Sequence, residues 1–389
     1  MSTLTIAWHG LDLNVDGYNI YRSDTPIDPN NLPSPIASVG PNIGSYDDNN
    51  INSGKIYYYR IGSIQGASEA IGKEQKLFAG TFIMVTASED ATARKVNFFS
   101  KEEWKYSFPR YKDDTYNTVF QSCAINGKEK TIYIGAGYNN YDLTKLDFYG
   151  NTLWKFKSQD QGNIDGHSGK IFNVAIDNNG NIITGSNDDT VKKIDSNGNH
   201  LWTFSVSGHG PTGLVVDSDN NVYSALSDNT LRTIDPDGNE IRKTGNFLSN
   251  ANDITLSSSK EVYVASGNGI IQKIDVDGNE VTSEGWPFNG HTDDVNAITV
   301  DPNDNICSAS KDGTVKKIDS NGNEIWTFSG HEAQVISIDS DSDGNVYSGG
   351  YYNDCMVKKI DPDGNEVWTF DGHVETSGYV YGLAVYLDY

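Results

Sequence analysis

The sequence predicts an all-β protein with a short β-sandwich in residues 1–76 and a ring of seven four-stranded sheets in residues 77–389. Three observations support this prediction. A unit of about forty residues recurs along the second part of the chain, which indicates one supersecondary unit copied several times. Short segments within each unit alternate apolar and polar residues, as half-buried strands do. Clusters of Asp, Asn and Gly separate these segments and are typical of tight turns.

The first 76 residues contain alternating segments such as YNIYRS and GKIYYYRI, separated by polar clusters. They resemble a fibronectin type III module, in which Trp8 would lie in the first core strand and Tyr57 would form the tyrosine corner. That family usually has another strand before the Trp strand, so the expected module lacks its first strand. The phrase RSDTPIDPNNLPSP resembles modules of bacteriophage virion proteins.

The clearest marker of the repeat is the segment KIDSNGNEIWTF, which begins at Lys317. Closely related segments begin at Lys193 and Lys359. Seven copies are marked at one shared position by Asn97, Asp147, Asp195, Asp235, Asp275, Asp319 and Asp361. In five copies a Trp lies seven residues further on, at Trp104, Trp154, Trp202, Trp326 and Trp368.

One copy, residues 295–328, contains four alternating segments, VNAITV, NICSAS, TVKKID and NEIWTF, joined by short turns. Four such strands form an antiparallel sheet with two faces to cover. A single sheet cannot cover both faces, whereas sheets arranged radially cover one another. The repeat therefore predicts a ring of sheets.

These copies resemble the WD-repeat family, whose fold is a β-propeller. A Gly-His pair, an alternating strand, a short turn and the segment SASKDGTVKKID carry the resemblance. The resemblance implies a network in which Asp312 fixes the ring of His291, with Ser308 as a further member. The Trp of that network is replaced by Ile318. The same pairing is predicted for His167 with Asp188, His209 with Asp228, and His331 with Asp354.

The two ends of the ring region complement each other. The first copy, near Thr81, supplies three strands without an opening one, and the residues after Phe370 supply one further strand. The resemblance implies that these strands combine into one sheet. Pairing of the N- and C-terminal strands would then close the propeller and leave no unpaired edge around the ring.

The composition argues against several kinds of partner. The chain has 29 basic and 53 acidic residues, and its net charge of −24 opposes binding to nucleic acid phosphates. The first residues lack the pattern of a signal peptide, and no apolar run is long enough for a membrane span. The three cysteines are too scattered for a disulfide framework or a zinc site. We expect no nucleic acid partner, no membrane insertion and no cofactor.

The sequence predicts no catalytic group. Five of the seven histidines follow a glycine and are spread one per copy, so they cannot converge on one substrate. A nucleophile elbow and a phosphate-binding loop are absent. Quinone-dependent propeller enzymes place a Gly four and a Trp eight residues after an Asp, but Gly322 and Trp326 follow Asp319 by three and seven.

Asp339, Asp341 and Asp343 match the first half of a calcium-binding loop. Gly350 stands where that loop has its bidentate Glu. Neighbouring copies carry comparable Asp- and Asn-rich segments at this point, so a plain turn between two strands is the alternative interpretation.

Four tyrosines lie in turns that are longer than those of the other copies. We expect them on one rim of the ring, where rigid aromatic rings suit contact with a sugar or a protein. Packing against neighbouring sheets is the alternative. The residues are Tyr138, Tyr141, Tyr351 and Tyr352.

These features lead to a functional hypothesis with two rivals. We expect a non-enzymatic structural or adhesive protein of a bacteriophage virion, in its tail, baseplate or capsid surface, made in the host cytoplasm. The N-terminal sandwich would bind other virion proteins, and the propeller would contact a host-surface glycan or protein. The rivals are an intracellular WD-repeat scaffold and a propeller enzyme that is quinone-dependent or acts on glycans.

Overall fold

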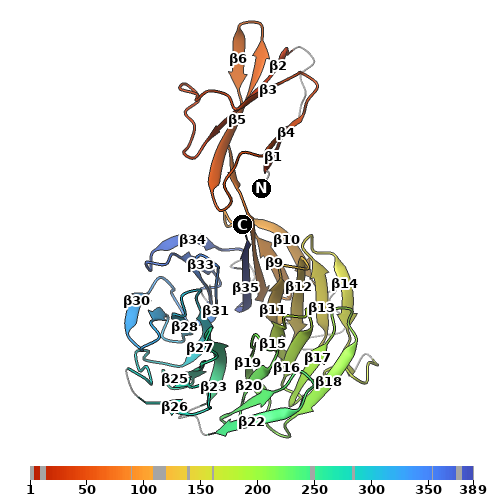
Figure 1. Ribbon diagram of the computed structural model, residues 1–389, viewed down its shortest axis with the longest axis vertical. Coiled ribbons are helices and arrows are strands. Elements are labelled where there is room, and N and C mark those ends of the chain that lie inside the picture. Colours follow the sequence, from red (N-terminus) through yellow and green to blue (C-terminus); the bar gives the residue numbers. More distant parts are fainter. Residues whose placement is uncertain are drawn as a thin grey trace. The chain divides into compact units, whose positions relative to one another are not determined.

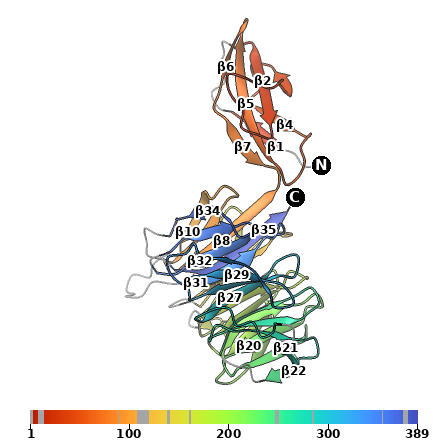
Figure 2. The same ribbon diagram turned by 90° about the vertical axis from the view of Figure 1, so that its left-hand side faces the viewer.

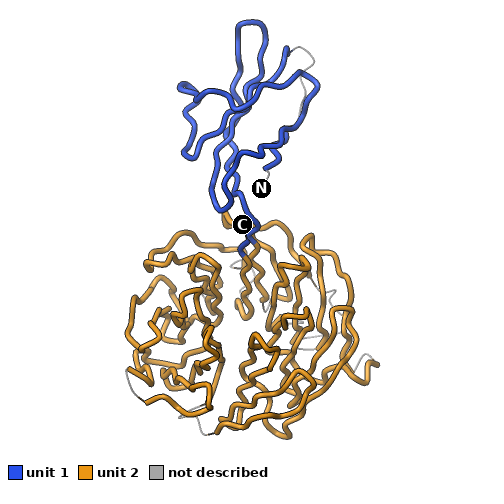
Figure 3. The backbone as a smooth tube through the Cα atoms, viewed as in Figure 1, with its two compact units in different colours: residues 1–82, 387–389 blue, residues 83–386 orange. Residues whose placement is uncertain are grey.

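Figure 1 and Figure 2 show the computed structural model of the chain. The chain divides into two compact units, which Figure 3 distinguishes by colour. Unit 1 comprises residues 1–82 and 387–389, and unit 2 comprises residues 83–386. The residues that the structure describes are 4–8, 15–88, 90–107, 120–137, 141–159, 162–245, 250–282, 285–352, 354–373 and 379–388.

Unit 1 contains two antiparallel sheets. One pairs β1 (Leu4–Ala7) with β4 (Ser45–Asp48). The strands of the other are, in spatial order, β3 (Ala37–Val39), β2 (Gly17–Ser23), β5 (Ile56–Gln65) and β6 (Ser68–Ile71), and β7 (Gln75–Phe78) also pairs with β5. Ile6 of β1 packs in one buried cluster with Ile20 of β2 and Tyr59 of β5, so the two sheets share a core.

Unit 1 contains Tyr57 and Trp8, the two residues of this region that the sequence analysis singled out. The Asn52 N–H donates a hydrogen bond of 2.9 Å to the Tyr57 hydroxyl, which is the bond of a tyrosine corner. Trp8 lies one residue beyond β1 rather than within it, and its ring packs on Tyr18 with the centroids 5.4 Å apart. Among the described residues, β1 pairs only with β4.

The boundary between the units lies at Phe82 rather than after Lys76. The boundary predicted from the sequence falls inside β7, where Lys76 pairs with Tyr58 of β5. Ala79 is also buried in the core of unit 1. These contacts assign the segment up to Phe82 to the first unit.

Unit 2 consists of repeated four-stranded antiparallel sheets. The sheet that contains both ends of the unit has the order β10 (Glu102–Ser107), β9 (Thr92–Val96), β8 (Thr81–Ser88) and β35 (Val380–Asp388). The next three sheets are β11 (Phe120–Asn126), β12 (Thr131–Ala136), β13 (Leu143–Asp147) and β14 (Thr152–Phe156); β15 (Ile171–Ile176), β16 (Ile182–Ser186), β17 (Thr190–Ile194) and β18 (His200–Ser205); and β19 (Pro211–Val216), β20 (Val222–Leu226), β21 (Thr230–Ile234) and β22 (Glu240–Gly245). The last three are β23 (Ala251–Leu256), β24 (Val262–Ser266), β25 (Ile271–Ile274) and β26 (Glu280–Val281); β27 (Val295–Val300), β28 (Ile306–Ser310), β29 (Val315–Ile318) and β30 (Glu324–Phe328); and β31 (Val335–Ser340), β32 (Val346–Gly350), β33 (Val357–Ile360) and β34 (Glu366–Phe370).

The first strands of successive sheets lie side by side, from β11 through β15, β19, β23 and β27 to β31 (Figure 1). Apolar side chains fill the space between sheets: Val335 and Ile338 of β31 pack with Ala309 and Val315 of the preceding sheet. Each sheet thus covers a face of its neighbour, as in a β-propeller. The prediction of an all-β chain with repeated four-stranded sheets is confirmed. The described residues contain no helix long and apolar enough to cross a membrane.

A Trp on an outer strand joins one sheet to the turn of the next. Trp326 Nε1 donates a hydrogen bond of 3.0 Å to the Pro362 carbonyl. Gly364 in the same turn has a φ of +90°, and a Cβ there would lie 3.0 Å from Trp326 Cγ. The Trp of one sheet therefore requires the Gly of the next, which explains why both recur in the sequence. Equivalent bonds join Trp104 to Phe148, Trp154 to Ser196, Trp202 to Pro236 and Trp286 to Ser320.

The strand β35 lies beside β8 (Figure 2). It is also bonded to β31, because Ser337 Oγ donates to the Val380 carbonyl over 2.7 Å and Asp339 Oδ2 accepts from the Val385 N–H over 2.7 Å. Toward β11, Gly382 approaches Ser122 so closely that a Cβ on this glycine would lie 2.9 Å from Ser122 Cα. The strand β35 therefore contacts both β31 and β11.

Candidate functional site

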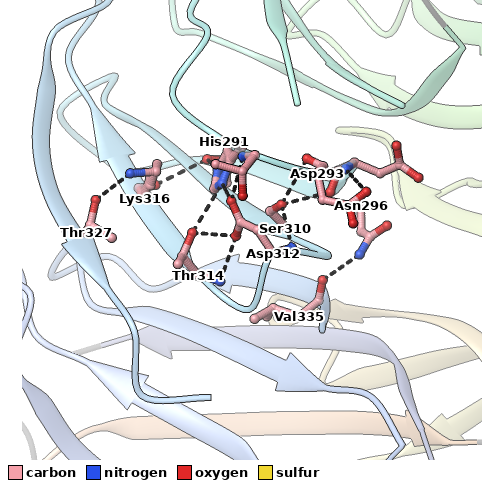
Figure 4. A network of polar contacts seen from close by, with 12 residues as sticks. His291, Asp293, Asn296, Ser310, Asp312, Thr314, Lys316, Thr327 and Val335 are labelled. Carbon is pink, nitrogen blue, oxygen red and sulfur yellow. Dashed lines mark hydrogen bonds and ion pairs between the residues drawn. The ribbon is translucent and has the colours of Figure 1, made fainter. Parts of the chain in front are cut away.

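His291 lies at the centre of a buried polar network (Figure 4). Its Nδ1 lies 2.9 Å from Asp312 Oδ2, and its Nε2 lies 2.9 Å from Ser308 Oγ. The Asp312 carboxylate also accepts hydrogen bonds from the Thr292 N–H and from the N–H and hydroxyl of Thr314. The network ties the segment before β27 to β28 and to the turn that follows β28.

The same arrangement recurs in two further sheets. In both, His Nδ1 contacts a carboxylate, at 2.9 and 2.6 Å, and His Nε2 contacts a hydroxyl at 2.8 Å. These three His–Asp pairs are the ones expected from their positions in the repeat. The residues are His167 with Asp188 and Thr184, and His331 with Asp354 and Ser348.

A fourth network, around His373, was not found from the sequence. His373 Nε2 lies 2.8 Å from Thr86 Oγ1, and its Nδ1 lies 3.4 Å from Asp90 Oδ2. His373 precedes β35, whereas both partners belong to the opposite end of the unit. The pair Gly372-His373 was an available signal, but its partners are recognisable only when the two ends of the unit are combined in one sheet.

The structure does not bring His209 and Asp228 together as the sequence analysis predicted. The His209 side chain is exposed, and the Asp228 carboxylate instead accepts from Thr230 and pairs with Arg232. Ser224, which takes the place of Ser308 in this sheet, has a buried hydroxyl without a partner in the described part of the chain. His209 and Asp228 are nineteen residues apart, whereas the intact pairs are at least twenty-one residues apart. The shorter segment between them therefore leaves the His209 ring outside the network.

Burial and hydrogen bonding fix the protonation state of the network. Burial lowers the pKa of His167 and of His291 below the usual value, so both rings are neutral near pH 7. Burial alone would raise the pKa of Asp312, but bonds from Thr314, Thr292 and His291 hold it at about 2. Because an ionised carboxylate only accepts, His291 Nδ1 carries the proton and donates, and Nε2 accepts from the Ser308 hydroxyl.

A hydroxyl, an imidazole and a carboxylate in this order are also the parts of a nucleophilic triad. A triad must present its hydroxyl to a substrate, and here Ser308 is 0% exposed and His291 is 5% exposed. The corresponding Thr184 and Ser348 are equally buried. The geometry therefore suits the locking of three segments together, and it offers no access for a substrate at these hydroxyls.

Of the three aspartates considered for calcium, Asp339 and Asp341 accept hydrogen bonds within the protein, and Asp343 is exposed. Asp341 accepts from the Asp343 and Asn345 N–H groups and from the Tyr347 hydroxyl, and Lys359 Nζ lies 3.7 Å from its carboxylate. Asp339 accepts from backbone N–H groups of its own strand and of β35. No cluster of His, Cys, Asp or Glu able to hold a metal ion occurs among the described residues. The alternative interpretation, a plain turn, accounts for these contacts.

The first strands of the sheets surround a cavity of 620 Å³. Asp253 and Asp339 line this cavity. The Asp253 carboxylate accepts a hydrogen bond from the Ile298 N–H, and the Asp339 carboxylate accepts one from the Val385 N–H. Both donors belong to the next sheet. Burial raises the pKa of both carboxyl groups to about 7, although the N–H donors act in the opposite direction.

Four tyrosines from two distant segments form a cluster beside this cavity. Tyr351 and Tyr352 come from the β32–β33 turn, Tyr379 precedes β35, and Tyr381 lies in β35 and lines the cavity. We call these four residues the tyrosine cluster. Tyr352 is 60% exposed, and the other three are half-buried.

The other two rim tyrosines predicted from the sequence are Tyr138 and Tyr141. Tyr141 is half-buried in the β12–β13 turn, and Tyr138 lies outside the described residues. The sequence analysis missed Tyr379 and Tyr381, because their approach to the β32–β33 turn depends on the position of β35.

Comparison with known proteins agrees with this geometry. Three segments, residues 158–195, 282–319 and 322–361, match the family described as WD40, the WD domain with G-beta repeats. Each matched segment contains one of the three intact His–Asp pairs predicted from the sequence. These three segments therefore resemble WD40 repeats.

The fold is also similar to a solved structure, the crystal structure of the WD40 β-propeller domain of Doa1. The TM-score is 0.56 at 18% sequence identity, and the match covers 69% of this chain and 86% of that one. A likeness at this identity concerns the fold alone. No curated protein matches the chain.

Proposed function

We propose that this protein is a non-enzymatic interaction protein whose propeller presents a binding face. One observation carries the proposal: the hydroxyls of the His–Asp networks are buried away from any substrate, whereas Tyr352 of the tyrosine cluster is 60% exposed. A WD40 propeller suggests a protein-interaction platform, which is consistent with buried polar networks and an exposed aromatic surface.

The proposal includes a closed ring of seven sheets. The contacts of β35 with β8, β31 and β11 support it. A repeated lysine contact gives independent support: Lys145 Nζ donates to the Ser196 carbonyl in the turn of the next sheet. From the last sheet, Lys359 Nζ lies 4.6 Å from the ring centroid of Phe98, in the turn between β9 and β10. A lysine of the last sheet thus contacts the corresponding turn of the first sheet, although through a ring rather than a carbonyl, and this contact supports closure.

Unit 1 is proposed to be a fibronectin type III-like module that attaches the protein to other virion proteins. The Tyr57 hydrogen bond and the core shared by two sheets support the module. The resemblance of the RSDTPIDPNNLPSP phrase to bacteriophage modules supports the virion as its location. In this proposal the protein is an accessory or adhesive component of the tail, baseplate or capsid surface, and the propeller contacts the host surface.

Mass spectrometry of purified virions tests the location directly. The account expects peptides from both units at a constant ratio to the major structural proteins after density-gradient purification. A particle preparation without this chain, from cells that contain it in the soluble fraction, would contradict the virion role.

The second candidate is an intracellular WD-repeat scaffold, and the WD40 repeats favour it as much as they favour a virion protein. Recovery of the chain from the soluble fraction in a stable complex with non-virion proteins would support this candidate.

A further inference from the structure

The tyrosine cluster arises from a local lengthening of one turn. Six residues separate β32 from β33, whereas four separate β28 from β29 in the preceding sheet. The longer turn carries Tyr351 and Tyr352, and the start of β35 brings Tyr379 and Tyr381 to them. Two segments that are distant in sequence thus contribute rings to one surface of unit 2.

Three rings of the tyrosine cluster are close to parallel. Tyr351 and Tyr379 stack with their centroids 4.1 Å apart at an interplanar angle of 17°. Tyr352 lies 6.3 Å from Tyr379 at 28° and 6.4 Å from Tyr351 at 32°. Tyr351 and Tyr379 therefore cover part of each other's faces, and Tyr352 is the exposed ring beside this stack. Tyr381 lies at 82° to Tyr379 and lines the cavity.

The exposure of Tyr352 is maintained at a conformational cost. Its φ of +56° lies in the left-handed region, which residues with a side chain rarely adopt. Hydrogen bonds of the turn hold it there: Cys355 Sγ donates to the Tyr352 carbonyl, and the Asp354 N–H donates to the Tyr351 carbonyl. Such conformations concentrate at ligand contacts, where the surrounding structure sustains them.

The geometry narrows the class of ligand. A cationic ligand is best enclosed by several free ring faces, whereas the Tyr351 and Tyr379 faces are stacked on each other here. An anionic ligand is opposed by the net charge of −24. The remaining ligand is neutral, with a flat apolar face, and a pyranose sugar presents such a face through its axial C–H bonds.

The cavity beside Tyr381 favours a sugar over a proline-rich peptide, which also stacks on aromatic rings. Gln121, Thr212 and Asn252 line it, and because Thr212 and Asn252 already donate to the Ala225 and Val295 carbonyls, they offer acceptor oxygens to a ligand. Sugar hydroxyls can form hydrogen bonds with these groups, whereas proline rings have no donor to offer. We propose that the tyrosine cluster binds a neutral oligosaccharide, with one sugar on the Tyr352 ring and the chain directed toward the cavity. This inference rests on the proposed interaction function.

The test uses the full chain on an array of immobilised neutral oligosaccharides built from glucose, mannose, galactose and N-acetylglucosamine. The strongest glycan is then titrated by calorimetry against four variants. Tyr352→Ala should weaken binding about tenfold, the order of one aromatic contact. Tyr379→Ala should have at least this effect, and Tyr352→Phe should bind within about twofold of the original chain, because its ring still stacks. Tyr149→Ala removes a tyrosine that is 83% exposed outside the tyrosine cluster and should change nothing.

Unchanged thermal melting of Tyr352→Ala shows that any loss of binding is local. The inference is overturned if the original chain binds no glycan on the array, or if Tyr352→Ala binds as tightly as the original chain. Selective binding of a PxxP peptide that is lost in Tyr352→Ala would also overturn it, in favour of a peptide ligand. Presence in virions without glycan binding would refute the sugar assignment alone, whereas glycan binding by a chain absent from virions would refute the virion role alone.

Discussion

A buried imidazole has two nitrogens to satisfy, and each intact network of unit 2 provides one carboxylate and one hydroxyl for them. The spacing of the repeat makes the His–Asp pairs predictable, because each histidine precedes an inner strand and each aspartate lies in the turn after the next strand. The failed pair of His209 and Asp228 shows the limit of this reasoning: residue types recur there, but the shorter segment leaves the histidine exposed.

Replacing Asp312 with Ala should lower the free energy of unfolding by about 1–3 kcal/mol, because the buried His291 ring loses its acceptor. Urea unfolding near pH 7 measures this change. Asp293→Ala is the matched control, since its side chain is 46% exposed and pairs only loosely with Lys311. It should change stability by less than about 0.5 kcal/mol. Equal effects of the two substitutions would refute the structural role of the network.

The cavity carboxyl groups should make stability fall as pH rises. An unfolded Asp ionises near pH 3.9, whereas Asp339 in the folded chain keeps its proton to about pH 7. Between these values the folded state binds more protons than the unfolded state, so this residue's contribution to the unfolding free energy decreases with pH.

Asp339→Asn removes this contribution, so the stability of the variant relative to the original chain should rise between pH 4.5 and pH 7.5. Parallel urea titrations at both pH values measure the difference. Asp343→Asn, in the following turn, is the control and should show no such trend. A difference between Asp339→Asn and the original chain that is independent of pH would mean that the carboxyl group ionises alike in both states.

At the scale of elements, the outer strand of one sheet contacts the turn of the next sheet, and this contact recurs along unit 2. The sequence predicts the strands and the Asp–Gly turns well, because alternation and turn chemistry are local properties. It does not reveal that the Trp of one sheet rests on the Gly of the following one, since this contact joins residues such as Trp326 and Gly364 across two sheets. Tyr379 and Tyr381 of the tyrosine cluster escaped prediction for the same reason.

Gly364→Ala should destabilise unit 2 through two effects, a φ of +90° and a contact of 3.0 Å with Trp326. Gly162→Ala is the matched control, because Gly162 has a φ of +88° and no atom of the described residues lies within 4 Å of the added Cβ. We expect a loss of about 1 kcal/mol for the control from the backbone alone and a larger loss for Gly364→Ala. Thermal unfolding of both variants checks this, and equal losses would exclude a role for the Trp contact.

At the scale of the whole molecule, the account depends on the strand β35. Its residues complete the sheet of β8, donate to and accept from β31, and approach β11 at Gly382. It also carries Tyr381 and follows Tyr379 directly, so the tyrosine cluster and the proposed closure depend on the same strand. The resemblance to WD repeats implied that the C-terminal strand would join the first copy. The contacts of this strand with its two other neighbours depend on side-chain geometry that the sequence alone does not give.

Calorimetric unfolding of a chain that ends at Phe370 tests the proposed closed ring most directly. Loss of β35 would expose the edge of β8 and open the ring, so we expect a broadened transition of lower enthalpy and a tendency to aggregate. A chain that ends at Asp388 is the control and should unfold as the full chain does. A single sharp transition at the original temperature in the chain that ends at Phe370 would contradict closure by the C-terminal strand.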